Sequence, residues 1–205
     1  MNEFDLKAAA WDENPVHIER TAAITSMMLK TIPANPEFKV LEFGAGTGIA
    51  AFLLKDHFRK IVMIDSSPGM VRIMKRKILK SNAKNLYVRL FDLERNPWRG
   101  RKFDLVMTQM VLHHIADIEG IIIKFHNFLR PGGYLAIADL YPEDGSFHGD
   151  GFTGHRGFDT DWLTELLYRN GFSNVSSGKC FEIKKQFTET ETKQFDIFLL
   201  TARRN

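Results

Sequence analysis

FKVLEFGAGTGIAAFLL, residues 38–54, is the stretch of sequence that decides the fold. It opens with an apolar run typical of a buried strand, continues through three closely spaced glycines, and ends in an apolar run typical of a helix. Glycine reaches backbone conformations that a β-carbon disfavours, and it lets a ligand approach the main chain closely. The order of strand, tight turn and helix therefore predicts the start of a nucleotide-binding α/β unit.

The glycine spacing and the acid before it discriminate between cofactors. In the dinucleotide fingerprint G-x-G-x-x-G, counting from Gly44 puts the third glycine at Ile49, whereas counting from Gly46 puts it at Ala51, which the relaxed form accepts. Glu42 lies two residues before the turn, where a carboxylate would repel a pyrophosphate but attract a ligand that carries an ammonium and a sulfonium. No Gly-Lys-Ser/Thr follows, so the phosphate-binding P-loop is excluded as well.

Short apolar runs and helical patterns alternate along most of the chain, which predicts a doubly wound α/β fold with a mostly parallel seven-stranded sheet. We expect strands at 38–43, 60–65, 86–91, 103–108, 134–140, 174–187 and 194–203, with the last two forming an antiparallel hairpin. Helices are expected at 3–11, 15–31, 47–58, 68–82, 117–128 and 160–169, and a turn at 130–133. We interpret residues 1–205 as one domain, with a helical cap over 1–36 and a core over 37–205.

The ends of the predicted strands bring polar residues to one edge of the sheet. Ligands of open α/β sheets bind beyond the carboxyl ends of the strands, and here these ends carry Asp65, then Asp92, then Gln109. Asp65 follows Gly44 by about twenty residues, a spacing at which a carboxylate can accept hydrogen bonds from ribose hydroxyls. Either acid alone fits a helix or turn cap. Together with Glu42 they predict one rim of carboxylates around a shared ligand.

Residues 42–48, Glu-Phe-Gly-Ala-Gly-Thr-Gly, resemble the D/E-x-G-x-G-x-G motif of class I S-adenosylmethionine (SAM)-dependent methyltransferases. Four more segments resemble further motifs of this superfamily, in its small-molecule branch (methyltransferase type 11/12-like). They are residues 65–70, 91–93, 103–117 and 129–135. The resemblance implies a Rossmann-like methyltransferase fold, SAM as the methyl donor and S-adenosylhomocysteine (SAH) as the product. It implies cofactor binding by Glu42, Gly44, Ala45, Gly46, Gly48, Asp65, Ser66, Met70, Asp92, Leu93 and Gln109.

Two histidines after the fourth predicted strand are the candidate catalytic residues. A general base is needed only if the acceptor is protonated when it attacks. His113 and His114 lie beside the expected position of the methyl group, and the resemblance favours His114, which matches a histidine commonly found there. The alternative is that the pair packs under the following loop and hydrogen-bonds to the backbone.

Trp11 and two loop histidines are the candidate substrate contacts. Trp11 lies near the start of the chain beside two acids, where a large aromatic side chain would serve as a lid over the substrate. His148 and His155 lie in the glycine-rich segment 141–158, either as substrate contacts or as surface residues. With the nearby acids they match no strong metal-binding spacing, so no metal is expected.

Composition and charge limit the compartment and the partners. The single Cys180 excludes an internal disulfide, and the sequence has neither a signal-peptide pattern nor an apolar run long enough for a membrane span, so we expect a cytoplasmic protein that does not engage membranes. The formal net charge is +3. The basic residues cluster on the predicted helix 68–82 as a solvated face, so nucleic acid is not the expected partner.

The sequence as a whole predicts methyl transfer from SAM to a small-molecule acceptor by in-line displacement. Residues 108–111, Thr-Gln-Met-Val, replace the Asn/Asp-Pro-Pro-aromatic element of DNA enzymes that methylate amino groups, and this disfavours DNA as the substrate. Two alternatives stay open. One is an RNA or protein methyltransferase that uses the basic helix, and the other is a non-catalytic domain that binds SAM or a partner.

Overall fold

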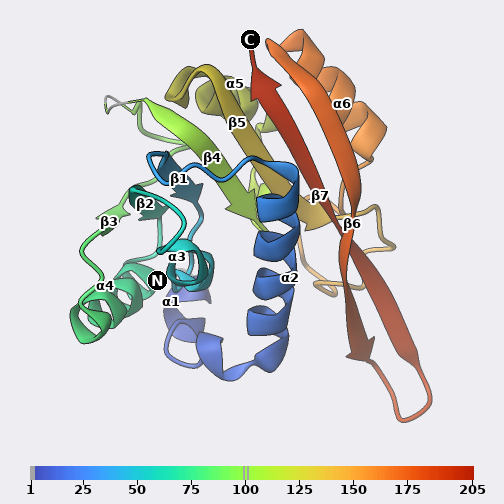
Figure 1. Ribbon diagram of the computed structural model, residues 1–205. Coiled ribbons are helices and arrows are strands. Elements are labelled where there is room, and N and C mark those ends of the chain that lie inside the picture. Colours follow the sequence, from blue (N-terminus) through green and yellow to red (C-terminus); the bar gives the residue numbers. More distant parts are fainter. Residues whose placement is uncertain (1–2, 99, 101) are drawn as a thin grey trace.

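The computed structural model describes residues 3–98, 100 and 102–205, and it contains one seven-stranded sheet with helices on both faces (Figure 1). The strand order is β3-β2-β1-β4-β5-β7-β6. The strands are β1 (Lys39–Phe43), β2 (Lys60–Asp65), β3 (Leu86–Leu90), β4 (Phe103–Gln109), β5 (Leu129–Leu140), β6 (Phe172–Gln186) and β7 (Thr192–Arg204). The first five strands run parallel, and β7 pairs antiparallel with both of its neighbours. The predicted fold class, including the terminal hairpin, is confirmed.

The helices begin where the sequence places capping residues. They are α1 (Glu3–Lys7), α2 (Pro15–Thr31), α3 (Ile49–Leu54), α4 (Pro68–Ser81), α5 (Ile118–Phe128) and α6 (Thr160–Arg169), with 3-10 turns η1 (Trp11–Glu13) and η2 (Leu112–His114). The side chain of Asn14 accepts a hydrogen bond from the Val16 N–H, and that of Ser67 accepts one from Met70. Each cap precedes a proline at the first helical position, where its missing N–H costs nothing.

Alternation along the strands divides the interior into two apolar layers. In β1, Leu41 and Phe43 point to the layer that α5 and α6 cover, whereas Val40 points to the layer covered by α2, α3 and α4. Glu42 falls between Leu41 and Phe43, so its side chain points to the α2 and α3 side. Figure 1 shows α2 in front of the sheet and α5 and α6 behind it. None of the helices among the described residues is long and apolar enough to cross a bilayer.

Two sequence-based boundaries are wrong. The segment 130–133, predicted to be a turn, lies inside β5, which starts at Leu129 opposite Phe103 and continues past a register shift with Gly132 at φ 76°. An irregularity of this kind lets a strand pass through residues that would otherwise break the ladder. The single helix expected over 3–11 is interrupted between α1 and η1. Alanines occupy this break, so tertiary contacts outweigh their helix propensity.

Those contacts tie the N-terminal segment to the glycine turn and to the start of α4. The Asp5 carboxylate accepts hydrogen bonds from Ser67 Oγ at 2.6 Å and from the Gly69 N–H at 2.8 Å. The Asp12 carboxylate accepts one from Thr47 Oγ1 at 2.5 Å and pairs with Lys77 Nζ at 2.7 Å. The first helical residues are therefore held across the carboxyl edge of the parallel strands.

Candidate active site

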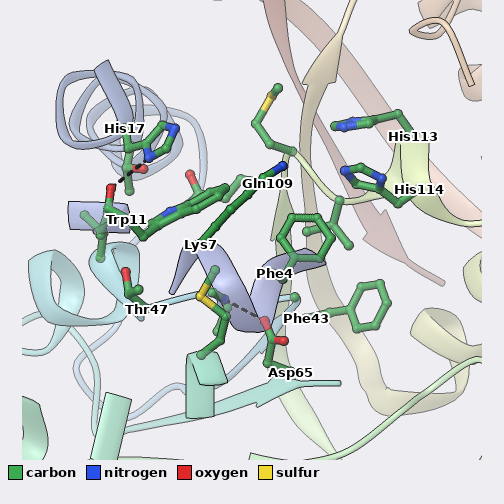
Figure 2. Close-up of a pocket in the computed structure, with 18 of the residues that line it drawn as sticks. Phe4, Lys7, Trp11, His17, Phe43, Thr47, Asp65, Gln109, His113 and His114 are labelled. Atoms are coloured by element: carbon green, nitrogen blue, oxygen red, sulfur yellow. Dashed lines mark hydrogen bonds between the residues drawn. The ribbon is translucent and has the colours of Figure 1, made fainter. Parts of the chain in front are cut away.

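A cavity of about 720 Å³ opens at the carboxyl edge of the sheet. Its walls come from the ends of the first four strands, the N-terminal segment, the first half of α2, η2, the loop after β5 and the C-terminal end of β6. Figure 2 shows Thr47 and Asp65 on one side of it and His113 and His114 on the other, with Phe4 of α1 between them. A volume of this size holds a ligand of several hundred daltons.

The glycine turn presents bare main chain to this cavity. Gly44 and Gly46 have φ angles of 66° and 57°, which favour glycine. A β-carbon on Gly44 would lie 2.4 Å from Val111 Cγ2, so no side chain fits there. A β-carbon on Gly46 would meet nothing within 4 Å, because this residue borders the open cavity. Ala45 also lines the cavity.

Gly48 has a different role from the one expected. It does not line the cavity, and a β-carbon on it would lie 3.0 Å from Met63 Sδ and 3.2 Å from Met74 Cγ. Its φ of 82° sets the N-terminus of α3. The third glycine of the motif therefore permits close packing of α3 against β2 and α4, and its contact with the cofactor stays a prediction.

Asp65 and Asp92 lie at the cavity, as their strand-end positions predict. The two oxygens of Asp65 accept hydrogen bonds from the N–H groups of Gly46 at 2.7 Å and Ser67 at 2.8 Å. Burial raises the pKa of Asp65, although these N–H groups oppose the shift. Asp92 Oδ1 accepts bonds from the main chain two and three residues later. Each carboxylate keeps lone pairs that can accept hydrogen bonds from a ligand.

Four other predicted cofactor residues also lie at the cavity. Ser66, Met70, Leu93 and Gln109 all line the cavity. The Gln109 Oε1 atom is buried and has no hydrogen-bond partner among the described residues, so it is available to a ligand donor.

Glu42 does not line the cavity, so the expected rim of carboxylates has Asp65 and Asp92 there, and the role of Glu42 toward the cofactor stays a prediction. Only 1% of its surface is exposed, and it borders a separate small pocket beneath α2 together with Thr108 and Gln109. Neither carboxylate oxygen makes a hydrogen bond of good geometry to a described residue, although the main-chain N–H of Ala51 lies near enough to oppose the rise in the pKa. Burial, and then the charge of Asp65, raise the pKa of Glu42 to about 8. Glu42 lies away from the cavity because side chains alternate along β1, and the next residue, Phe43, is the one that lines the cavity.

His113 is held by a buried carboxylate at the end of β5. Its Nδ1 lies 2.6 Å from Oδ1 of Asp139, and its backbone N–H donates to Oδ2 of the same residue at 3.3 Å. Asp139 is completely buried, and His113 is 1% exposed. A neutral His113 therefore keeps its proton on Nδ1 and carries the free lone pair on Nε2.

His114 and His148 complete a cluster of imidazoles around His113. The ring centroid of His113 lies 4.2 Å from that of His114 and 4.9 Å from that of His148. Burial, followed by repulsion from the neighbouring histidines, lowers the pKa of His114 to about 4. Burial, then His113 and Lys185, lower the pKa of His148 to about 4 as well. Both rings are therefore neutral at pH 7.

Of the two remaining candidates for substrate contacts, one lines the cavity and the other does not. Trp11 lines the cavity, and its ring stacks on His17 at 4.2 Å. His155 does not line it. Its Nε2 lies 3.0 Å from the carbonyl oxygen of Ile115, and its N–H donates to the His113 carbonyl oxygen at 2.8 Å. His155 thus fastens the glycine-rich loop to η2, and its contact with a substrate stays a prediction.

Sequence reasoning missed Arg20 and Asp139. Arg20 lines the cavity from α2 but is only 8% exposed, and its Nε has no hydrogen-bond partner among the described residues. Burial lowers the pKa of Arg20 to about 10, against the attraction of Asp139. Both residues carried a signal, because Asp139 lies near the end of a predicted strand and Arg20 shares a helix face with Ile24 and Met28.

The cavity lies at the switch point of the mostly parallel sheet, where the strand order reverses between β1 and β4. Open α/β proteins bind nucleotide-like ligands at this point.

Residues 41–137 match the family model of a methyltransferase domain. An uncharacterized methyltransferase of Schizosaccharomyces pombe is 32% identical over 66% of this chain and 54% of its own length. The chain spans 54% of the length of this relative and 47% of the Bacillus subtilis methyltransferase YcgJ, and only 4–6% of the polyketide synthases it matches.

Solved structures share the fold at low sequence identity. One is a Haloferax volcanii protein described as a methyltransferase, solved in complex with the Trm112 methyltransferase activator. Its TM-score is 0.78 at 20% identity, over 100% of this chain and 98% of that one. Another is the magnesium protoporphyrin IX methyltransferase of Synechocystis with bound SAH. Its TM-score is 0.69 at 19% identity, over 92% of this chain and 83% of that one.

The methyltransferase-domain match over residues 41–137, which is slightly less than half of the chain, and the similar methyltransferases support a class I SAM-dependent methyltransferase. The resemblance drawn from residues 42–48 is therefore confirmed at the level of the superfamily.

Proposed function

We propose that this protein transfers a methyl group from SAM to a small-molecule acceptor. The observation that carries the proposal is one continuous cavity that joins the glycine turn and the strand-end acids to an imidazole-lined end. The first end suits an adenosyl cofactor, and the second end leaves room for an acceptor beside it.

The residues at the first end fit the parts of the cofactor. The bare main chain at Gly46 leaves space that a β-carbon would fill, so the cofactor can approach the turn. Asp65 then accepts from the ribose hydroxyls, and Asp92 from the adenine amine. The Arg20 guanidinium, buried with an unpaired Nε, would bind the carboxylate of the methionyl group. Gln109 Oε1 accepts a hydrogen bond from a ligand N–H.

Bound SAM would supply an electrophilic methyl group on a sulfonium. The protein's own contribution is to align the acceptor and exclude water. Phe4 and Trp11 cover the cavity from the N-terminal segment, with their ring centroids 6.2 Å apart. At the far end, His113 Nε2 can take a proton from the acceptor, because Asp139 on Nδ1 stabilises the imidazolium.

A small acceptor is favoured over RNA or protein by the position of the basic residues. The cations of α4 lie on an exposed face and do not line the cavity, and they include Arg72, Lys75, Arg76 and Lys80. Lys77 is engaged by Asp12. The Synechocystis neighbour, a magnesium protoporphyrin IX methyltransferase, has a small-molecule substrate in its description.

The test has a binding arm and a turnover arm. Calorimetry with SAH should show one site per chain in the wild type and an affinity reduced by about 10–100-fold in Asp65→Ala, because hydrogen bonds that involve a charged group are lost. Asp56→Ala, at an exposed position away from the cavity, is the matched control. A panel of metabolites is then scored for SAH release. Wild-type affinity in Asp65→Ala would reject the site, and SAH binding without turnover on any acceptor would favour a non-catalytic domain.

A further inference from the structure

Three histidines from two separate segments bring their nitrogens together at the far end of the cavity. His113 and His114 belong to η2, and His148 belongs to the glycine-rich loop after β5. One ring nitrogen from each lies within 4.8 Å of the other two. Figure 2 shows His113 and His114 side by side at the cavity that they line.

We propose that His113, His114 and His148 form a site for a divalent transition metal, of which Zn²⁺ is the best match. Imidazole is a preferred ligand of zinc, copper, nickel and iron. Catalytic zinc sites use three protein ligands and leave a fourth position for water or substrate. Here the fourth position would face the cavity, which all three residues line.

Asp139 gives one ligand the support that metal-bound histidines require. Ligating histidines donate their second ring N–H to a carboxylate or carbonyl group, which fixes the tautomer and the ring orientation. The 2.6 Å contact between His113 Nδ1 and Asp139 does this within a fully buried environment and leaves Nε2 as the ligand atom. Asp139 is thus a positioning residue for the proposed site.

The other two rings have no competing polar partner. Neither His114 nor His148 makes a side-chain hydrogen bond to another described residue, and their polar nitrogens lie among rings, with Phe152 stacked on His148 at 4.0 Å. A metal ion satisfies all three lone pairs.

The ligands need only a small closure to reach metal geometry. Zinc–nitrogen bonds of 2.0–2.1 Å in a tetrahedral site place the donors about 3.4 Å apart, somewhat closer than the 4.8 Å limit seen here. His113 is fixed, but His148 is exposed and lies between glycines 145, 149 and 151, all with positive φ. An inward shift of His148 would bring its nitrogen to the distance that the metal requires.

The role of the metal rests on the proposed function. A bound hydroxyl or thiol loses its proton more readily, because the cation stabilises the resulting anion. That proton passes to solvent, and the heteroatom lone pair forms the new bond to the methyl carbon. The sulfur–methyl bond breaks with its electrons left on sulfur, which gives neutral SAH. The acceptor is therefore a molecule with a hydroxyl or thiol that can bind the metal. With the metal bound, His113 acts as a ligand and not as the proton acceptor.

Cobalt binding to the chelator-treated protein of residues 1–205 tests the site without any cofactor. We expect one Co²⁺ per chain, seen by calorimetry and by visible absorption bands. Asp139→Asn should weaken binding by about 10–100-fold, and His114→Ala and His148→Ala at least as strongly. His148 is exposed, so its replacement leaves the fold intact. His57→Ala, an exposed histidine outside the cavity, is the matched control and should bind like the wild type.

The outcomes separate this proposal from the methyl-transfer proposal. Absence of Co²⁺ binding, or unchanged affinity in both His114→Ala and His148→Ala, would overturn the metal site even if SAH binds. Stoichiometric Co²⁺ binding lost in those variants supports the site even if SAH does not bind. Methyl transfer that proceeds at the same rate in chelator as with Zn²⁺ would overturn the role given to the metal.

Discussion

Replacing Glu42 with Gln should remove a pH-dependent loss of stability. The Glu42 carboxyl is 1% exposed and makes no hydrogen bond of good geometry to a described residue. Burial and Asp65 raise its pKa from 4.5 to about 8, against the opposing effect of the Ala51 main-chain N–H. Gln has nearly the same shape and is neutral at every pH. The comparison therefore isolates the cost of ionising this one buried group.

The sign and size follow from proton linkage. Below pH 4.5 the carboxyl is protonated in both the folded and the unfolded chain, so the wild type and the variant respond to pH alike. Between pH 4.5 and about 8 only the folded chain keeps the proton, so wild-type stability falls relative to Glu42→Gln as pH rises. At about 1.4 kcal/mol per pH unit, the difference grows to at most about 5 kcal/mol above pH 8.

Urea denaturation of both proteins at pH 4.5, 6.5 and 8.5 measures this difference. We expect the gap in the free energy of unfolding to widen steadily with pH, and the melting temperature of the variant to exceed that of the wild type by up to roughly 10–20 °C at pH 8.5. Parallel pH profiles for the two proteins would refute the reasoning, because they would mean that Glu42 is solvated or paired.

Three further predictions concern the cavity and its cover. Gly46→Ala should lower the affinity for SAH by at least about 10-fold, while costing the fold only about 1–2 kcal/mol for the left-handed conformation, as calorimetry and denaturation can show. Arg20→Met should weaken SAH binding by about 10–100-fold without lowering the melting temperature, because the charge it removes is buried and lacks a full set of partners. An unchanged affinity would remove Arg20 from the site. Asp12→Asn should speed hydrogen exchange in residues 3–13 but change global stability by less than about 1 kcal/mol, since it releases the partly exposed Lys77 and weakens the bond to Thr47. Unchanged exchange would mean that this clamp does not hold the cover.

The sequence predicts the parts of the site that depend on local order along the chain. The strand–turn–helix pattern at 38–54 and the acids at the ends of β2 and β3 are local signals, and the structure places Gly46, Asp65 and Asp92 at one cavity. The face of the sheet on which Glu42 lies can also be predicted, because alternation along a strand puts it opposite Phe43. Matching the motif residue by residue ignores this alternation.

Contacts between distant segments account for what the sequence could not supply. Gly48 is required by the packing of Met63 and Met74, which lie 15 and 26 residues further along the chain. The grouping of His114 with His148 likewise depends on how the loop after β5 folds back onto η2. No spacing rule relates such residues until the sheet order is known.

A crystal structure of the protein with SAH tests most directly the claim that this cavity holds an adenosyl cofactor. We expect the ribose hydroxyls at Asp65, the adenine beside Asp92 and Leu93, and the sulfur pointing toward the histidine end. Density for SAH outside this cavity, or a cavity that stays empty at saturating SAH, would contradict the claim.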